Sequence, residues 1–342
     1  MSSPELYLAI DCGGTKTVAV LCAPEGTILA SALGGGSNFS YLGLDAFLKR
    51  IAEVTSSALS TALQSSVTIT PPTDPETCIT GTPPYNIRAA WLGIAGVDSP
   101  SAASLLLPHV STLLSVPAER LIISNDTHLL AAPLRILPDV PTAVTVVAGT
   151  GSIVASFREG AVDAPLEALA RAGGWGWILG DEGGGFDVGR TAVRALLSER
   201  DMGTTGASVT HGPLKEKLLK KFGVDDVMDL LGALYAPDST SPLPREGRLS
   251  SLCPIVFEAA FEDGDPLAIL VVKDCAQKLA LQIMTVLHTP GQEVRALLMF
   301  QVTRVNRIGR RTLARSVQIR VSCALVVLCV VSTATVSLSS SH

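Results

Sequence analysis

Several kinds of residue are scarce in this chain of 342 residues. Aromatic residues make up only 4% of it, which argues against a stacking surface for single-stranded nucleic acid. The formal net charge is −5, so there is no overall positive field to attract nucleic acid. The seven cysteines include no Cys-x-x-Cys pair, which argues against a zinc site or a disulfide framework and favours reduced thiols in a cytosol-like compartment.

Two widespread nucleotide-binding motifs are also missing. No Gly-x-x-x-x-Gly-Lys-Ser/Thr stretch occurs, which excludes a Walker-type phosphate loop. No Gly-x-Gly-x-x-Gly follows a predicted strand, so a Rossmann dinucleotide site is unsupported. The N-terminal stretch has neither a basic flank nor a long apolar run, so we expect no secretory signal and a cytoplasmic protein.

What is present predicts an α/β protein with two lobes. Hydrophobic residues make up 47% of the chain, which allows a large core, and the length favours two domains. In the first half, three apolar runs predict an antiparallel meander, and helix, strand, helix, strand and helix follow. Near residue 140 the strand–turn–strand unit recurs before a mostly helical part. We therefore expect a first lobe over 1–139 and a second lobe over 140–293.

The expected elements have these bounds. The strands are 6–11, 17–22, 27–32, 87–96, 120–126, 142–149 and 153–160, and the helices are 44–63, 101–115, 127–137, 186–199, 213–222, 225–234, 247–262 and 265–287.

The stretch DCGGTKT, which begins at Asp11 between the first two predicted strands, is suited to binding phosphate. Gly13 and Gly14 let the backbone approach a ligand closely, and successive N–H groups in such a turn form an anion-binding nest. Thr15 and Thr17 offer hydroxyl donors, and Asp11 is placed to hold Mg²⁺ through water molecules. The alternative is an ordinary hairpin turn.

A second turn, GTGS at 149–152, has the same chemistry and contributes Thr150 and Gly151. Two such turns, one in each lobe, would bind a polyphosphate from both sides of a cleft. A single turn of this kind is weak support for a phosphate site, and the pair at corresponding strand pairs is stronger.

Asp126 stands at the end of another predicted strand, where open α/β sheets present ligand-binding groups. A carboxylate there, opposite a phosphate nest, could accept a proton from a substrate hydroxyl. The alternative is that Asp126 or Asn125 caps the helix that follows.

The stretch RAGGWGWILGDEGGGFDVG at 171–189 is the most specific in the chain. Its glycines let the backbone wrap around a ligand, a tryptophan face suits the apolar face of a sugar ring, and the acids Asp181 and Glu182 suit sugar hydroxyls. A purely structural, glycine-dense loop is the alternative.

Together, the stretches AIDCGGTKT, GGGSN, LGIAG, SND, GTGS and GGWGWILGDEGGGFDVG resemble the BadF/BadG/BcrA/BcrD-type ATPases and, among them, the N-acetylglucosamine kinases. The resemblance covers roughly 5–290, with the motifs in order. It implies an actin-like ATPase fold with two ribonuclease H-like lobes. It also implies ATP-dependent phosphorylation of the 6-hydroxyl of N-acetylglucosamine, with ATP and Mg²⁺ as cofactors.

The resemblance assigns a role to each matching residue. The first phosphate loop would contain Gly13, Gly14 and Thr15, the second would contain Thr150 and Gly151, and the sugar would be bound by Asn38, Asp126, Gly174, Trp175, Gly176 and Asp181. Asp126 would also be the catalytic base, and Asp11 would lie near the metal. The expected partner is an amino sugar; no nucleic acid is expected, and a homodimer is allowed.

Two other functions stay open at this point. The first is a sugar-binding protein without catalysis that has lost ATP. The second is an activator-type ATPase of the same family, which the lack of a convincing cluster-binding cysteine pattern disfavours.

The segment 294–342 departs from the family. After Glu293 the chain has no Asp, Glu or Lys, and no Gly-Gly turn of the kind that lies against the adenosine in relatives. A changed reading frame or retained non-coding sequence would explain the break in composition. The alternatives are a weak candidate membrane span at 321–338 and a Val-rich strand that completes the second lobe. We expect an incomplete second lobe, weak or absent ATP binding, and no membrane attachment.

Overall fold

The computed structural model describes residues 4–71, 85–137, 140–160, 166–204, 212–287 and 296–302; at 204 and 296–302 it describes the backbone alone. By its contacts the chain divides into two compact units, Met1–Ala132 and Pro133–His342. The division falls close to the predicted boundary after residue 139. The units are described one at a time below.

The first unit is built on a sheet of five strands in the order β3-β2-β1-β4-β5. Strands β1, β4 and β5 are parallel, and β2 is antiparallel to both β1 and β3. Its elements are β1 (Glu5–Cys12), β2 (Lys16–Cys22), β3 (Ile28–Gly35), α1 (Phe39–Leu63), β4 (Asn86–Ile94), α2 (Pro100–Leu114), β5 (Leu121–Ser124) and α3 (Asp126–Ala131). The predicted order of strands and helices is confirmed.

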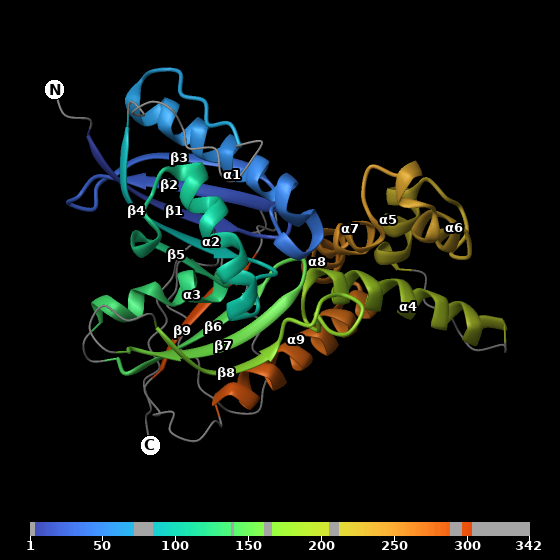
Figure 1. Cartoon of the computed structure of the whole chain (residues 1–342). Coiled ribbons are helices and arrows are strands. Elements are labelled where there is room, and N and C mark those ends of the chain that lie inside the picture. The colour runs from blue at the N-terminus through green and yellow to red at the C-terminus, as the bar shows by residue number, and fades with distance from the viewer. Residues whose placement is uncertain are drawn as a thin grey trace. The chain divides into compact units, whose positions relative to one another are not determined.

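One face of this sheet forms the core of the first unit. In β1 every second side chain is buried, because successive residues of a strand point to opposite faces. Leu6, Leu8 and Ile10 contribute to a single apolar cluster with buried residues of α1 and α2, such as Phe47 and Leu113. The two helices therefore cover the same face of the sheet (Figure 1).

Helix α1 begins before the predicted helix 44–63. Asn38 caps its N-terminus, and Gly43 inside it has a non-helical backbone with φ of 70°. The apolar periodicity that predicts a helix starts only after this kink, which is why the first turn was missed. Residues 72–84, between α1 and β4, lie outside the described residues.

The second unit contains a sheet of four strands in the order β8-β7-β6-β9. Its elements are β6 (Thr142–Ala148), β7 (Ser152–Arg158), β8 (Glu167–Gly173), α4 (Gly185–Thr204), α5 (Pro213–Phe222), α6 (Asp229–Tyr235), α7 (Arg245–Ser250), α8 (Cys253–Phe261), α9 (Pro266–Leu287) and β9 (Ala296–Val302). The recurring strand–turn–strand unit is confirmed as β6 and β7, which are antiparallel.

Two strands of this sheet were not predicted. Strand β8 has the sequence EALARAG, whose alanines give no apolar alternation. Strand β9 lies beyond Glu293 and pairs in parallel with β6 along its whole length. The sheet therefore continues into the segment of changed composition, and residues 303–342 lie outside the described residues.

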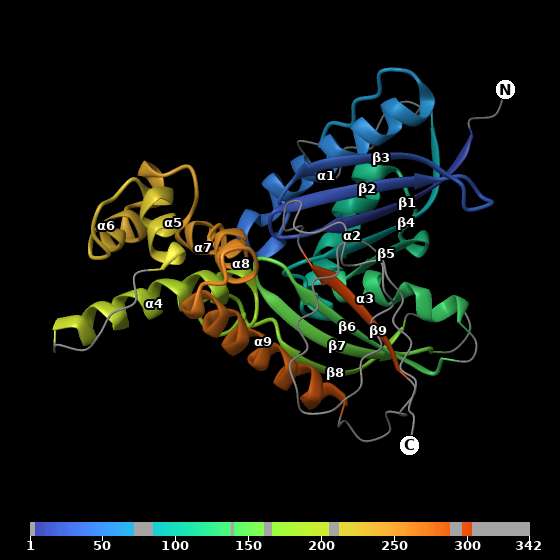
Figure 2. The same ribbon diagram turned by 180° about the vertical axis from the view of Figure 1, so that it is seen from behind.

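Helix α9 joins the sheet of the second unit to its helices (Figure 2). Val286, near its end, packs with Val144, Val146 and Val154 of β6 and β7. Its first half packs in a second apolar cluster with α4, α5 and α8. The helix predicted at 247–262 is divided into α7 and α8. Among the helices of the described residues, none has both the length and the apolar character needed to cross a membrane.

Candidate active site

In the first unit, several strand ends lie at one edge of the sheet. The parallel register places Asp11 of β1 opposite Gly93 of β4, and Gly93 opposite Ser124 of β5. Strand β3 runs in the same direction as β1, because both are antiparallel to β2. The ends of these four strands and the segments that follow them therefore come together at this edge, and they contain the first unit's predicted site residues.

The first glycine turn is held by its backbone and leaves two N–H groups available. Gly13 N–H donates to the carbonyl of Lys16 over 3.0 Å, and Ser37 N–H donates to the carbonyl of Gly13 over 2.9 Å. Within the described residues, the N–H groups of Gly14 and Thr15 donate to no hydrogen bond. Two adjacent donors of this kind are what a phosphate-binding nest requires.

The loop after β3 packs directly on this turn. A Cβ atom at Gly36 would collide with the carbonyl oxygen of Gly14, so only glycine fits at this position. Thr17, predicted to offer a hydroxyl to phosphate, has a different role. It is fully buried, and its hydroxyl lies 2.6 Å from both the Gly35 carbonyl and the Ser37 hydroxyl. Thr17 therefore fixes the loop after β3, and this prediction is wrong.

Asn38 follows the same loop and links it to the end of β4. Its side-chain oxygen accepts from Ser40 N–H over 3.0 Å and so caps α1. The hydroxyl of Ser40 donates to the carbonyl of Gly96, and Phe39 N–H donates to the carbonyl of Ala95. These bonds hold Asn38 at the edge that carries Asp11 and the glycine turn.

Asp126 is the first residue of α3, and its neighbour Asn125 is the cap. The side-chain oxygen of Asn125 accepts from Thr127 N–H over 3.0 Å and from the Thr127 hydroxyl over 2.7 Å. Of the two capping residues considered from the sequence, Asn125 is therefore the one observed. The carboxyl group of Asp126 also interacts with backbone N–H groups at this helix start, its own and that of Thr127.

The environment of Asp126 changes its acidity. The residue is only 8% exposed. Burial raises the pKa of Asp126 to about 7, and the negative charges of Asp11 and Asp98 contribute to the rise. Asp98, which sequence reasoning missed, also accepts from the side-chain amide of Asn125 over 3.0 Å. A carboxyl group with a pKa near 7 is suited to accept a proton at neutral pH.

In the second unit, the turn between β6 and β7 repeats the chemistry of the first. Gly149 N–H donates to the carbonyl of Gly151 over 2.9 Å. The N–H groups of Thr150 and Gly151 donate to no hydrogen bond within the part of the chain that the structure describes. This turn therefore also presents two adjacent donors to an anion.

The predicted sugar loop starts directly after β8. The Arg171 guanidinium donates to the carbonyls of Gly173 and Gly174 over 3.2 and 2.7 Å, and it lies over the Trp175 ring at 5.0 Å. The Trp175 side chain is 61% exposed, so its ring is accessible to a ligand. Gly176 then begins a tight turn in which its carbonyl accepts from Gly180 N–H over 2.8 Å.

Asp181 lies against the second phosphate turn. Its carboxylate accepts from Ser152 N–H over 3.1 Å, and a Cβ atom at Gly151 would lie 2.5 Å from one of its oxygens. Burial raises the pKa of Asp181, and the charges of Glu182 and Asp187 add to the rise. The structure thus brings Asp181 to Gly151; its predicted contact with sugar stays a prediction.

A buried charged group that sequence reasoning missed supports this loop. Asp187 of α4 accepts from Gly183 N–H over 3.0 Å, from Arg190 over 2.7 Å and from Lys278 of α9 over 3.3 Å. Burial by itself would raise the pKa of Asp187, but these three donors outweigh it and hold the pKa below its ordinary value. No short-range pattern joins Lys278 to Asp187, which lies far away in the sequence.

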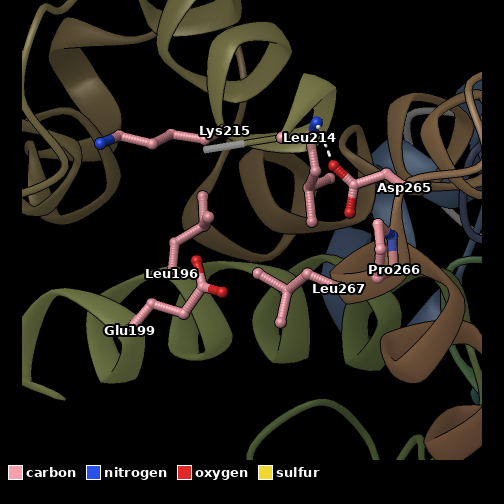
Figure 3. A pocket seen from close by; sticks show the side chains of 8 residues that line it. Leu196, Glu199, Leu214, Lys215, Asp265, Pro266 and Leu267 are labelled. Carbon is pink, nitrogen blue, oxygen red and sulfur yellow. Dashed lines mark hydrogen bonds between the residues drawn. The ribbon is translucent and has the colours of Figure 1, made fainter. Parts of the chain in front are cut away.

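A pocket among the helices of the second unit contains none of the predicted site residues (Figure 3). Leu196, Glu199 and Lys215 line it, together with Asp265. The carboxylate of Asp265 accepts from Leu214 N–H and Ala268 N–H, each over 2.9 Å. The carboxylate therefore accepts hydrogen bonds from the first turns of both α5 and α9 and links these two helices.

The residues at the first unit's edge fit a hydrated Mg²⁺. In the described residues, no three His, Cys, Asp or Glu side chains gather closely enough to enclose a metal ion. Mg²⁺ usually keeps several of its waters and needs only one or two carboxylates, such as Asp11 at the end of β1.

Comparison with known proteins shows which family and which relatives the chain resembles. Residues 8–301 match the model of the BadF/BadG/BcrA/BcrD ATPase family. The chain is 28% identical over 290 residues to the N-acetyl-D-glucosamine kinase of Dictyostelium discoideum, covering 84% of this chain and 81% of that one. It is 25% identical over 283 residues to the N-acetylmuramic acid/N-acetylglucosamine kinase of Clostridium acetobutylicum, covering 82% and 79%.

A solved structure of a protein from Chromobacterium violaceum is similar in fold. It superimposes with a TM-score of 0.58 at 23% identity, and the match covers 87% of each chain. The two units of this chain accordingly have the actin-like ATPase fold, as the sequence predicts.

Proposed function

Since this chain belongs to the BadF/BadG/BcrA/BcrD ATPase family, we propose that it is a sugar kinase that transfers the γ-phosphoryl group of ATP to N-acetylglucosamine. Two relatives with this sugar in their names support the substrate. The observation that carries the proposal is the edge of the first unit, where buried Asp126 shares the strand ends with a turn that offers free N–H donors.

In this mechanism Asp126 is the general base. Its ionised carboxylate accepts the proton of the sugar 6-hydroxyl as that oxygen attacks the γ-phosphorus, and the bond from phosphorus to the β,γ-bridging oxygen breaks. The raised pKa of Asp126 makes the carboxylate basic enough to take the proton at neutral pH. General-base assistance of this kind contributes about 10²- to 10⁴-fold in rate.

The two glycine turns bind phosphate in this proposal. The N–H groups of Gly14 and Thr15 donate to phosphate oxygens at one turn, and those of Thr150 and Gly151 do so at the other. Bound Mg²⁺ supplies positive charge against the phosphates, and Asp11 would hold it through water. That both turns bind a single triphosphate stays a prediction from the sequence.

The sugar would be recognised by the loop after β8. The accessible ring of Trp175 suits the apolar face of a pyranose, and the carbonyl and N–H groups of Gly174 and Gly176 suit its hydroxyls. Asn38, with its side-chain oxygen engaged by Ser40, would offer its amide N–H₂ to the sugar.

We also propose that ATP binding is weak. The chain lacks a Gly-Gly turn after Glu293, where relatives place the adenosine, so the adenine pocket would lack a wall. A sugar-binding protein that no longer uses ATP is the second candidate, and this same observation favours it. A dissociation constant for ATP in the ordinary micromolar range would contradict the proposed weakness. The cytoplasmic location and the homodimer stay predictions.

A coupled kinase assay over a panel of sugars tests the function. We expect turnover with N-acetylglucosamine at millimolar ATP, and loss of turnover in Asp126→Asn. Asp229→Asn is the matched control, because Asp229 is also in the first turn of a helix but is exposed. Full activity of Asp126→Asn would remove Asp126 from its role, and sugar binding without any effect of nucleotide would favour the second candidate.

A further inference from the structure

Ser152 is the first residue of β7 and directly follows the second phosphate turn. All of its polar groups bond to the predicted sugar loop. Its N–H donates to Asp181 over 3.1 Å, its carbonyl accepts from Gly174 N–H over 2.8 Å, and its hydroxyl donates to the carbonyl of Glu182 over 2.7 Å. The side chain is nearly inaccessible, with the residue only 3% exposed.

These bonds fix both ends of the sugar loop to the phosphate turn. Gly174 lies at the start of the loop, and Asp181 and Glu182 lie at its end. The turn is also bonded to the start of α4, which follows the loop: the carbonyl of Gly149 accepts from Gly185 N–H, and the carbonyl of Thr150 accepts from Phe186 N–H. The turn and the loop are therefore one hydrogen-bonded body, although more than twenty residues separate Ser152 from Glu182 in the sequence.

We infer that Ser152 is a positioning residue that couples sugar binding to phosphate binding, an inference that rests on the proposed function. Ser152 touches neither ligand in that proposal and acts through Asp181 and Glu182. A ligand that orders the turn also orders the loop through these bonds, so the second ligand meets a site that is already ordered. The coupling is reciprocal: each ligand raises the affinity of the other by the same factor.

The substitution Ser152→Ala isolates the hydroxyl. It keeps the backbone bonds to Asp181 and Gly174 and removes only the bond to the Glu182 carbonyl. That carbonyl still accepts from the side-chain amide of Gln282 over 3.2 Å, so no buried acceptor is left unpaired. We therefore expect the variant to fold and to lose part of the coupling.

Ser156 provides a matched control on the same strand. It lies four residues on, so it faces the same side of β7, and it is 0% exposed. Its hydroxyl has no hydrogen-bond partner among the residues that the structure describes. Ser156→Ala thus removes the same buried atom from the same strand without breaking a bond.

The experiment is a calorimetric titration of the full chain with N-acetylglucosamine, with and without Mg²⁺-tripolyphosphate. Tripolyphosphate is chosen because it needs the phosphate turns but not the adenine pocket. We expect it to tighten sugar binding in the wild type and in Ser156→Ala. In Ser152→Ala this tightening should fall about fivefold, the effect of one hydrogen bond. Ser152→Thr, which keeps the hydroxyl, should restore it.

Three results would overturn the inference. Equal tightening in Ser152→Ala and Ser156→Ala would show that the hydroxyl does not couple the ligands, and the proposed kinase function would stand. No tightening in the wild type would also exclude the coupling. A chain that binds no sugar at all would remove the proposed function as well, so the two failures are distinguishable.

Discussion

Replacing Asp126 by Asn should make the protein more stable at alkaline pH while it removes activity. The native environment disfavours the charged carboxylate, because burial and the charges of Asp11 and Asp98 raise its pKa from 3.8 to about 7. Asn is close to Asp in shape and carries no charge, so it avoids the cost of ionising a buried group. Active sites typically contain such a group, whose perturbed pKa suits catalysis although its ionisation lowers the stability of the folded protein.

The magnitude follows from the shift in pKa. A rise of roughly three units corresponds to about 4 kcal/mol of unfolding free energy, at 1.36 kcal/mol for each unit. Because the folded-state pKa lies above the unfolded one, the folded state binds more protons between pH 3.8 and about 7. Stability from this group is complete below that window and is lost as pH rises through it.

Urea unfolding of the wild type and of Asp126→Asn at about pH 8 and about pH 4 measures this effect. The variant should exceed the wild type by up to about 4 kcal/mol at the higher pH and match it at the lower pH. Asp229→Asn, an exposed site, should change stability by less than about 0.5 kcal/mol at both. Equal stabilities of Asp126→Asn and the wild type at pH 8 would refute the buried, perturbed carboxyl group.

Three further predictions concern Asp126, the loop after β3 and two helices of the second unit. The kcat/KM for sugar should rise with pH to a plateau above about 7, because only ionised Asp126 accepts a proton; a flat pH–rate profile would contradict this. Gly36→Ala should weaken Mg²⁺-tripolyphosphate binding at least about tenfold in calorimetry, since its Cβ collides with the backbone of Gly14. Gly232→Ala, at an exposed position of α6 where a Cβ atom meets nothing, is its control and should bind normally. Asp265→Ala should lower the unfolding free energy by roughly 2–3 kcal/mol, because two helix N-termini lose their acceptor; a loss below about 0.5 kcal/mol by urea unfolding would reject it.

The order of elements was predictable where local pattern decides it. Period-two alternation in β1 and helical periodicity in α9 are set by the burial of one face, and both were recovered. Strand β8 was missed because its alanines carry no apolar signal, and it exists through pairing with β7. Strand β9 has the apolar run ALLMFQV, which alone does not distinguish a buried strand from a buried helix, and its pairing with β6 decides between them.

The candidate site was predictable at the level of motifs. Each glycine turn was found from its composition, and the structure adds which of its N–H groups are available. The supporting roles of Asp98, Ser152 and Asp187 were not predictable, although Ser152 and Asp187 lie within the quoted motifs, because their partners are brought to them by the tertiary fold. Thr17 was misjudged for the same reason, since the loop that buries its hydroxyl comes from β3.

The central claim is that Asp126 takes a proton from a sugar hydroxyl that attacks ATP. Phosphorus NMR of the full chain incubated with N-acetylglucosamine, Mg²⁺ and saturating ATP tests it most directly. The account predicts a sugar 6-phosphate signal that grows with time and grows at least about 100-fold more slowly with Asp126→Asn. Absence of any sugar phosphate at saturating ATP, or equal rates for the two proteins, would contradict it.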